Sequence, residues 1–411
     1  MGKQIAAIVL IFLFTTFAWM ILGMSVVDRT HSADSGLSKG VESNWGSAQQ
    51  QSPPAVLVTQ IDPRTAQETT NGTISTKVIN ETVITPLAIA QSRIRVAFDL
   101  DQRQKGLLWF ATYRVTFHGD YVFRNSTPSD QVMVKLTFPA ADAIYDDLVV
   151  RVDGQPLVLT TENGAVSGSI RRPPGAPLHL EIGYRSQGLG TWDYKLGDAV
   201  SQVHDFAMQM TTNFDDIDFP QGGLSPTTKT RTGNGWLLTW QYSNLVTGYR
   251  IGMVMPEKLQ PGPLAGRISF FAPVSLLFFF FLIFIITRLR GIDLHPMHYF
   301  FLATSFFAFH LLLAYLADHI SIHAAFVICS AVSIFLVVSY LRIVIGSRFA
   351  FVEAGLTQFI YLVLFSYAFF FKGFTGLAIT IGAIVTLFAV MQLTARINWG
   401  RTPATTMAIA E

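Results

Sequence analysis

The chain has 411 residues, of which 50% are hydrophobic and only 14% are charged, whereas roughly a quarter of the residues in a soluble domain are charged. This composition, with 34 Phe residues and a mean hydropathy of +0.40, excludes a disordered polyelectrolyte, a collagen-like fibre and an ordinary soluble enzyme. The net charge of +2 is too small for a nucleic-acid-binding protein, so no nucleic acid partner is expected. The single cysteine excludes an intramolecular disulfide and a multi-cysteine zinc site.

Six apolar segments are long enough to cross a bilayer, which takes about 20 residues. They cover Ile5–Met24, Ile268–Thr287, His298–Ala317, Ile322–Leu341, Phe349–Phe371 and Phe374–Leu393. The first follows Lys3 as a signal peptide would, but no clear Ala-x-Ala cleavage site comes after Met24, so we expect a retained anchor. The sequence therefore predicts a multi-pass membrane protein that contacts the lipid bilayer.

Basic residues flank these segments unevenly. If the N-terminus lies inside, the inner flanks carry seven of them, namely Lys3, Arg288, Arg290, Arg342, Arg348, Arg396 and Arg401, and the short outer loops carry only Lys372. Because cytoplasmic loops are enriched in Lys and Arg, we expect both termini to be cytoplasmic and residues 25–265 to lie outside. In a bacterial host this corresponds to the inner membrane and the periplasm.

The segment outside the membrane reads as a tether followed by β-structure. Residues 32–54 are rich in Ser, Gly and Gln, and alternation of apolar and polar residues begins later, as in Ile94–Leu100, Tyr113–Phe117 and Val132–Phe138. Hairpin turns are predicted at three dipeptides, Asp153-Gly154, Asn163-Gly164 and Asn234-Gly235. We therefore expect an α+β membrane protein with a mainly antiparallel, sandwich-like domain.

These patterns predict five parts along the chain. They are a transmembrane anchor at 1–24, a flexible tether at 25–54, an extracytoplasmic β domain at 55–265, a five-helix bundle at 266–399 and a cytoplasmic tail at 400–411.

Three short motifs in the membrane half resemble those of a known family. They are Leu294-His295-Pro296-Met297-His298-Tyr299, the leucine-rich helix end that closes with Asp318-His319, and the final segment Thr394 to Trp399. On these residues the membrane half resembles the CreD family of inner-membrane proteins. His298, Asp318 and Asn398 stand where the family usually has Gln, Glu and Asp. The resemblance covers about 266–399, is partial over 205–255 and is weak before that.

The resemblance implies a role in cell-envelope integrity and colicin tolerance, and it supplies no catalytic mechanism and no cofactor. On this basis we expect a non-enzymatic protein whose outer β domain binds an envelope component or protein. A homo-oligomer is left open. The alternative is a transporter or channel for ions or small solutes, which His310, Glu353 and Gln358 within the bundle would serve.

Ionisable residues inside a bilayer cost free energy, so each one needs an explanation. Glu353, near the start of the fifth apolar segment, either faces the headgroups or belongs to a proton or ion relay. His310 and Cys329 lie at similar depth on neighbouring antiparallel helices. They either form a functional pair, or the thiol packs at a helix contact and the imidazole bonds a nearby carbonyl.

Asp318, His319 and His323 cluster around the short turn between the third and fourth segments. Histidine is the common pH switch and metal ligand, so one hypothesis is a weak divalent-metal or pH-sensitive site. The other is that polar residues simply end helices where water begins. The sequence has no Walker-type loop, no dinucleotide fingerprint, no nucleophile elbow and no H-E-x-x-H zinc helix, so no catalytic residue is assigned.

Overall fold

The protein is described from a computed structural model. It describes residues 2–70, 73–105, 108–162, 164–197, 201–371 and 373–395. The chain divides into two compact units. The helical unit comprises Met1–Asp34 and Leu259–Glu411, and the β unit comprises Ser35–Lys258.

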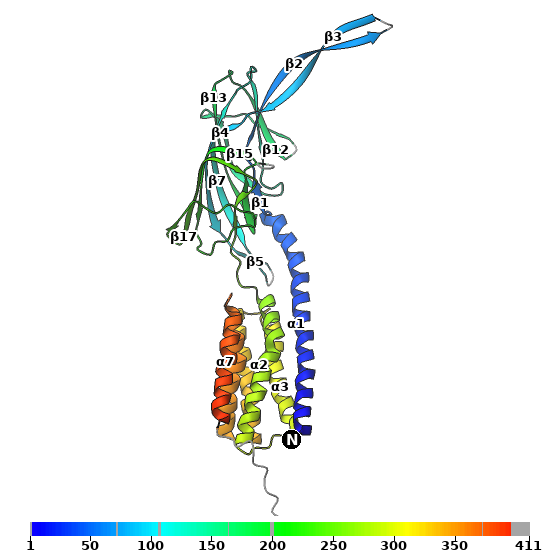
Figure 1. Cartoon of the computed structure of the whole chain (residues 1–411), viewed down its shortest axis with the longest axis vertical. Coiled ribbons are helices and arrows are strands. Elements are labelled where there is room, and N and C mark those ends of the chain that lie inside the picture. Colours follow the sequence, from blue (N-terminus) through cyan, green and yellow to red (C-terminus); the bar gives the residue numbers. More distant parts are fainter. Residues whose placement is uncertain are drawn as a thin grey trace, which may run out of the picture. The chain divides into compact units, whose positions relative to one another are not determined.

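Six helices within the described residues are long and apolar enough to cross a membrane, which confirms the six predicted spans. Figure 1 shows them running side by side in the helical unit. Four are regular helices: α1 (Gly2–Trp45), α2 (Pro261–Leu289), α3 (Pro296–Leu316) and α4 (Ile322–Val344). The fifth is built from η1 (Phe349–Ala354), α5 (Gly355–Gln358), η2 (Phe359–Leu364), α6 (Phe365–Tyr367) and η3 (Ala368–Phe370), and the sixth is α7 (Thr375–Thr394).

The fifth span departs from regular α-helix three times, at the six-residue π-helical segments η1 and η2 and at the 3₁₀-helical segment η3. A π-helical turn bonds residue i to residue i+5, so it is wider than an α-turn, and such turns are frequent at functional sites. Gln358 ends the short α-helical stretch between η1 and η2. This places a polar side chain at the most irregular part of the bundle.

Helix α1 is longer than the sequence predicts. It continues without a break to Trp45, whereas residues 25–54 were expected to form a flexible tether. Leu37, Val41 and Trp45 recur every four residues and so share one helix face. That face packs against Leu108, Phe110 and Leu189 of the β unit. Packing of this stripe stabilises helix where composition alone indicates a tether.

The described residues of the β unit form four sheets, and nearly all of their strand pairs are antiparallel, as predicted. The sheets run β10-β9-β13-β7-β4-β15-β17-β16, β11-β12-β8-β2-β3, β1-β14-β18 and β5-β6. The two parallel exceptions are β4 with β15 and β1 with β14. The strands are β1 (Gln49–Gln51), β2 (Ala55–Thr70), β3 (Thr73–Pro86), β4 (Ile89–Leu100), β5 (Arg103–Lys105), β6 (Leu108–Phe110), β7 (Thr112–Arg124), β8 (Gln131–Thr137), β9 (Tyr145–Val152), β10 (Gln155–Pro156), β11 (Thr160–Glu162), β12 (Ala165–Arg171), β13 (Pro177–Leu189), β14 (Thr191–Lys195), β15 (Ser201–Thr212), β16 (Thr228–Thr232), β17 (Gly235–Thr247) and β18 (Arg250–Val254).

One hydrophobic core joins the three larger sheets of the β unit. Its buried side chains alternate along each strand, so every second residue of β4, β7 and β13 faces inward. This alternation is what a sheet with one packed face requires. Large aromatic side chains, including Trp192, Trp240 and Tyr194, fill the centre.

The predicted hairpin turns agree with the structure in two cases and shift by one residue in the third. Val152 pairs with Gln155, and Asp153 and Gly154 both have positive φ, as a type I′ turn needs. Glu162 pairs with Ala165, although Asn163 of that turn lies outside the described residues. Thr232 pairs with Gly235, so the third turn is Gly233-Asn234 rather than Asn234-Gly235.

Candidate functional site

The helical unit holds a connected polar cluster at the point where α5 meets the second π-helical segment, η2. The Gln358 Nε2 atom donates to the Ser333 Oγ atom at 2.9 Å, and that hydroxyl donates to the Ser305 carbonyl at 2.7 Å. The Gln358 Oε1 atom is buried and has no hydrogen-bond partner among the described residues. A buried acceptor without a partner costs free energy, so this amide is a place where a donor would be bound.

A second set of hydroxyl contacts lies further along the same span. The Tyr361 hydroxyl and the Thr386 Oγ1 atom are 2.6 Å apart, which joins η2 to α7. The Ser275 hydroxyl donates to the Tyr361 carbonyl, and this bond joins α2 to η2. Lipid tails are as apolar as the helices, so the hydrophobic effect does not drive helices together inside a bilayer. Hydrogen bonds of this kind therefore help to hold transmembrane helices in contact.

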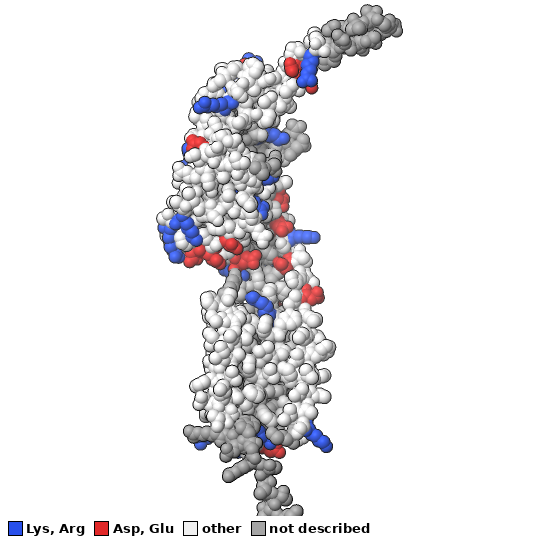
Figure 2. All heavy atoms as spheres, viewed as in Figure 1, with Lys and Arg blue, Asp and Glu red and all other residues white. Residues whose placement is uncertain are grey.

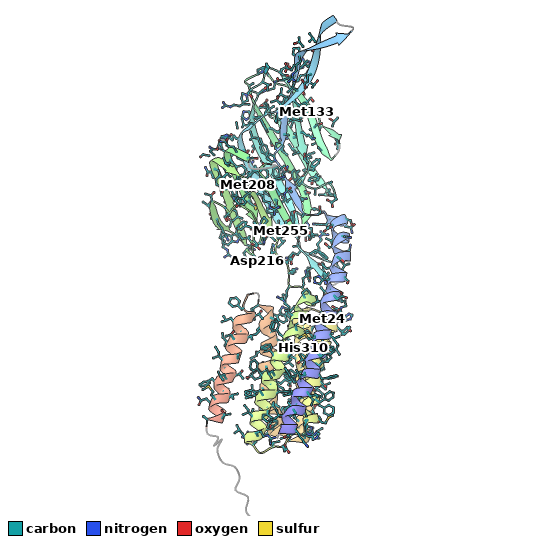
Figure 3. The ribbon with its side chains drawn as sticks, turned by 45° about the vertical axis from the view of Figure 1, so that its right-hand side comes forward. Met24, Met133, Met208, Asp216, Met255 and His310 are labelled. Carbon is teal, nitrogen blue, oxygen red and sulfur yellow. The ribbon has the colours of Figure 1, made fainter. Side chains whose placement is uncertain are left out.

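His310 lies among the helices of this unit, as Figure 3 shows, and its side chain is fully buried. Its Nδ1 atom donates to the Phe306 carbonyl at 2.9 Å, and its ring packs edge-on against Trp19 and Phe309. Cys329 is also buried, but no hydrogen bond joins it to His310 within the described part of the chain. The structure therefore agrees with the alternative in which the imidazole bonds a nearby carbonyl.

The Nε2 atom of His310 and the indole N–H of Trp19 are both buried without partners among the residues described. Because Nδ1 carries the proton that Phe306 accepts, Nε2 is an acceptor in the neutral ring. A donor and an acceptor thus remain unused on two rings whose centroids are 5.5 Å apart.

Glu353 forms an ion pair with Arg290, which the sequence analysis did not anticipate. Its side chain is only 13% exposed, and its second oxygen, Oε2, has no partner among the described residues. Arg290 follows directly after α2, so the pair joins the end of one helix to the start of another. In the sequence, the only indication of this pair was that Arg290 and Glu353 both lie at ends of apolar segments that are expected at the inner face of the membrane.

Asp318 is paired with Arg29 of α1 rather than with the neighbouring histidines. The Arg29 Nη2 atom lies 2.9 Å from the Asp318 Oδ2 atom and also donates to the Ala314 carbonyl at 2.7 Å. The ring of His323 instead packs against Phe370 at 5.1 Å. Across the described ranges, no group of three His, Cys, Asp or Glu side chains is placed to hold a metal ion.

The motif from Leu294 to Tyr299 builds the entry to α3. His295 is the N-cap, and its Nδ1 atom accepts from the Met297 N–H at 3.3 Å. Pro296 is the first helical residue, where its missing N–H has no intrahelical partner anyway. Leu294 and Tyr299 are buried, so four of these side chains serve the local structure. Trp399 lies outside the described residues.

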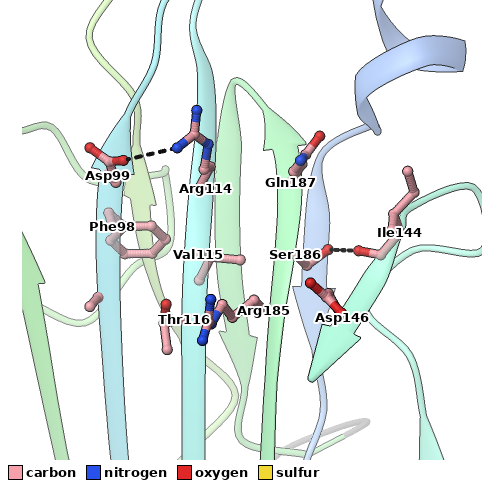
Figure 4. Close-up of a pocket in the computed structure, with 11 residues that line it drawn as sticks. Phe98, Asp99, Arg114, Val115, Thr116, Ile144, Asp146, Arg185, Ser186 and Gln187 are labelled. Carbon is pink, nitrogen blue, oxygen red and sulfur yellow. Dashed lines mark hydrogen bonds and ion pairs between the residues drawn. The ribbon is translucent and has the colours of Figure 1, made fainter. Parts of the chain in front are cut away.

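The β unit carries a pocket of about 330 Å³ on its eight-stranded sheet, shown in Figure 4. Arg114 lies between two carboxylates, with Asp101 at 2.9 Å and Asp99 at 3.8 Å. Arg185 pairs with Asp147 at 2.7 Å on the other side. Strand register brings these groups together, because Arg114 lies opposite Asp99 and Arg185 lies opposite Asp146.

The pocket is suited to binding rather than to acyl transfer. The Ser186 hydroxyl donates to the Ile144 carbonyl at 2.8 Å and accepts from the Gln49 Nε2 atom at 2.7 Å, so it is not set up as a nucleophile. Burial by itself would raise the pKa of the Asp101 carboxyl. Hydrogen bonds from Arg103 and Arg114 outweigh that effect and hold the pKa below its usual value. Asp101 does not line the pocket itself, but it pairs with the lining residue Arg114. Sequence reasoning missed the pocket because it depends on register between distant strands.

The membrane half also matches a known family. Residues 263–400 match the CreD family model. That family is described as inner membrane protein CreD, and the match confirms the predicted resemblance over the segment from α2 onward. The CreD region contains the polar cluster, His310, Glu353 and the α3 entry motif, whereas the β-unit pocket lies outside it.

No curated protein matches the chain. Solved structures match at low similarity. A Legionella pneumophila protein provisionally assigned to nutrient binding is 10% identical, with 57% of this chain and 76% of that chain covered and a TM-score of 0.35. An M1 zinc metallopeptidase from Deinococcus radiodurans is 13% identical, with 41% and 42% covered and a TM-score of 0.28.

Proposed function

We propose that this protein is a non-enzymatic inner-membrane protein that contributes to envelope integrity or stress tolerance. The observation that carries the proposal is the CreD match over residues 263–400, which covers five of the six membrane helices. The β unit binds an envelope component or an envelope protein. The mixed-charge pocket around Arg114 and Arg185 is its binding site.

The function is tested by deleting the gene and measuring sensitivity to detergents, envelope-active antibiotics and colicins. We expect the deletion to change sensitivity and the full-length chain to restore it. The variant Arg114→Ala should restore it less well, because it removes the cation between Asp99 and Asp101. Arg231→Ala is the matched control, since this exposed arginine pairs with Asp215 outside the pocket. Unchanged sensitivity of the deletion strain would contradict the proposal.

Partner binding is tested separately by photo-crosslinking from the pocket. A crosslinkable residue at position 144 should capture the same envelope component in repeated experiments, because Ile144 lines the pocket and is 63% exposed. The same probe at position 246 is the control, since Val246 is also 63% exposed and is not among the lining residues. Equal capture from both positions would argue against a specific site.

The proposed orientation places the β unit in the periplasm and both termini in the cytoplasm. Cys329 is the single cysteine and is fully buried, so added cysteines give a clean signal with an impermeant maleimide. Thr230→Cys on exposed strand β16 should be labelled in spheroplasts, and Ser347→Cys in the turn after α4 only after lysis. The reverse pattern would overturn the orientation.

A transporter or channel remains the second candidate, and the unpartnered Gln358 Oε1 atom beside two π-helical segments favours it. Flux through proteoliposomes should then fall in Gln358→Leu, His310→Ala and Glu353→Gln. Flux that none of these changes alters would exclude these residues as the pathway.

A further inference from the structure

A groove of about 830 Å³ runs along the surface of the helical unit between α4 and the fifth span. We call it the α4–η1 groove. Its walls are apolar and aromatic, with Phe335 on one side and Phe351 and Leu356 on the other. These three side chains are each more than half exposed. The volume lies in the range of pockets that bind small molecules.

The groove exists because small residues lie where the two helices approach. Ala331 on α4 and Gly355 on α5 both line it. A Cβ atom at position 355 would lie 3.3 Å from the Ala350 carbonyl oxygen and 3.4 Å from the Val338 Cγ2 atom, so there is little room for any side chain there. The π-helical turns of η1 add width beside this point.

One end of the groove is cationic. Arg342 of α4 lines it, and Arg348, which is not among the lining residues, stands directly before η1. Both arginines are exposed, and within the described residues neither has an ion-pair or hydrogen-bond partner. Residues 341–352 contain no Asp or Glu, and the next acid, Glu353, is already paired with Arg290. The charge of the turn is therefore left for a ligand.

Apolar walls that lead to two free arginines match a lipid whose acyl chain lies on the apolar side chains and whose negatively charged headgroup lies on the arginines. Basic pockets between membrane helices recognise anionic headgroups in this way.

We propose that the α4–η1 groove binds one anionic phospholipid of the bilayer, with an acyl chain against Phe335, Phe351 and Leu356 and the phosphate on Arg342 and Arg348. A second groove, between α1 and α2, gives a useful contrast. It is about 300 Å³ and is lined by Ile and Phe side chains such as Ile8 and Phe281, with no charged residue. We therefore expect headgroup selectivity only at the α4–η1 groove. The proposal does not depend on the function proposed above.

The test uses the full-length protein in a neutral detergent, titrated with dioleoyl phosphatidylglycerol or with dioleoyl phosphatidylcholine. Native mass spectrometry measures bound lipid, and thermal unfolding measures the stabilisation that binding causes. We expect phosphatidylglycerol to bind at least fivefold more tightly. Arg342→Gln and Arg348→Gln should each weaken its binding about fivefold, the equivalent of about 1 kcal/mol per arginine near an anionic lipid, and leave phosphatidylcholine unaffected.

The acyl-chain part of the site is tested by filling the groove. Ala331→Phe should weaken binding of both lipids, because the ring occupies the place of the chain. Ala324→Phe is the matched control: Ala324 is also exposed on α4, two turns earlier on the same face, and does not line the groove. Arg267→Gln is the control for charge, since Arg267 is an exposed arginine in the first turns of α2 and does not line the groove.

Three results would overturn the proposal. Equal affinity for the two lipids would show that the arginines do not discriminate between the two headgroups. An equal effect of Arg267→Gln would show a general charge effect. A shift from dimer to monomer on Ala331→Phe, with phosphatidylglycerol binding unchanged, would show that a second copy of the chain occupies the groove. If Ala331→Phe lowers the lipid-free Tm, Ala331→Leu replaces it.

Discussion

Ser333 is the central residue of the polar cluster in the helical unit, because its hydroxyl both accepts and donates. It accepts from the Gln358 amide and donates to the Ser305 carbonyl, and both Ser333 and Gln358 are fully buried. Gln358 already has one unpartnered atom, Oε1. The hydrogen bond from the Gln358 Nε2 atom to Ser333 therefore decides whether this polar side chain is tolerated in the bundle.

We predict that Ser333→Ala destabilises the helical unit by about 1 kcal/mol, in the range measured for hydrogen bonds between membrane helices. The cost arises because the Gln358 Nε2 atom loses its acceptor. Reversible unfolding in mixed micelles measures it. Ser339→Ala is the control, since that hydroxyl bonds the Leu336 carbonyl within its own helix. Gln358→Leu added to Ser333→Ala should recover part of the loss, and no recovery would contradict the argument.

Asp193 is a buried carboxyl of the β unit whose contribution to stability depends on pH. Its side chain is 9% exposed and lies 3.1 Å from Arg250. Burial raises the pKa of this carboxyl above 3.8, and Arg250 offsets only part of that effect. The folded state therefore holds a proton that the unfolded state has lost at pH values just above 3.8.

It follows that the contribution of Asp193 to stability falls as pH rises from 3.8 through its raised folded-state pKa. Asp193→Asn keeps the shape of the neutral side chain and removes this titration. The Tm of the variant minus that of the wild type should become more positive as pH rises from about 3.8. Thermal scans across that range measure it. A difference that falls with pH would show that the Arg250 ion pair dominates.

At the scale of elements, the sequence pattern predicted helices and strands correctly wherever their structure depends on neighbouring residues alone. Hydropathy predicted the six spans, and alternation placed β4, β7 and β8. It failed where a distant segment decides the outcome. The stripe Leu37, Val41 and Trp45 is helical because it packs on Leu108 and Phe110, which no window of sequence reveals. The Arg290–Glu353 pair and the β-unit pocket likewise depend on contacts between separate elements.

The β16–β17 hairpin shows why its turn shifts by one residue. Gly233 has a φ of +58°, so it supplies the left-handed conformation at the first turn position. Gly235 is needed for another reason, because a Cβ atom there would lie 1.9 Å from the Thr212 carbonyl oxygen. The glycine that resembled a turn residue in the sequence is in fact a point of close strand contact.

We therefore predict that Gly235→Ala costs about 3 kcal/mol, since backbone must move to admit the methyl group. Gly154→Ala is the comparison. Gly154 has a φ of +80° but open space around a Cβ, so only the strain of the left-handed conformation applies, about 1 kcal/mol. Chemical unfolding of the purified protein measures both. Equal costs at the two positions would show that the strand contact relaxes freely.

At the scale of the whole molecule, the question is whether α1 is an independent anchor or part of the bundle. Trp19, Leu22 and Val26 of α1 belong to the same buried cluster as residues of α2 and α3. Near the start of α1, the Gln4 amide donates to Asp293 at 2.8 Å. Further along the helix, Arg29 pairs with Asp318 and stacks on Tyr315 at 5.2 Å. These contacts make α1 a structural member of the six-helix unit.

The Arg29–Asp318 pair allows a sharp test of this view. Arg29→Asp places two carboxylates side by side, and Asp318→Arg places two guanidinium groups side by side, so each should lower stability by about 1 kcal/mol, as expected for a partly exposed pair. The double variant restores opposite charges and should recover most of the loss, although the Arg29 bond to the Ala314 carbonyl is not rebuilt. Unfolding of the full chain in micelles measures all three. If the two losses simply add in the double variant, the pair does not couple α1 to the turn after α3.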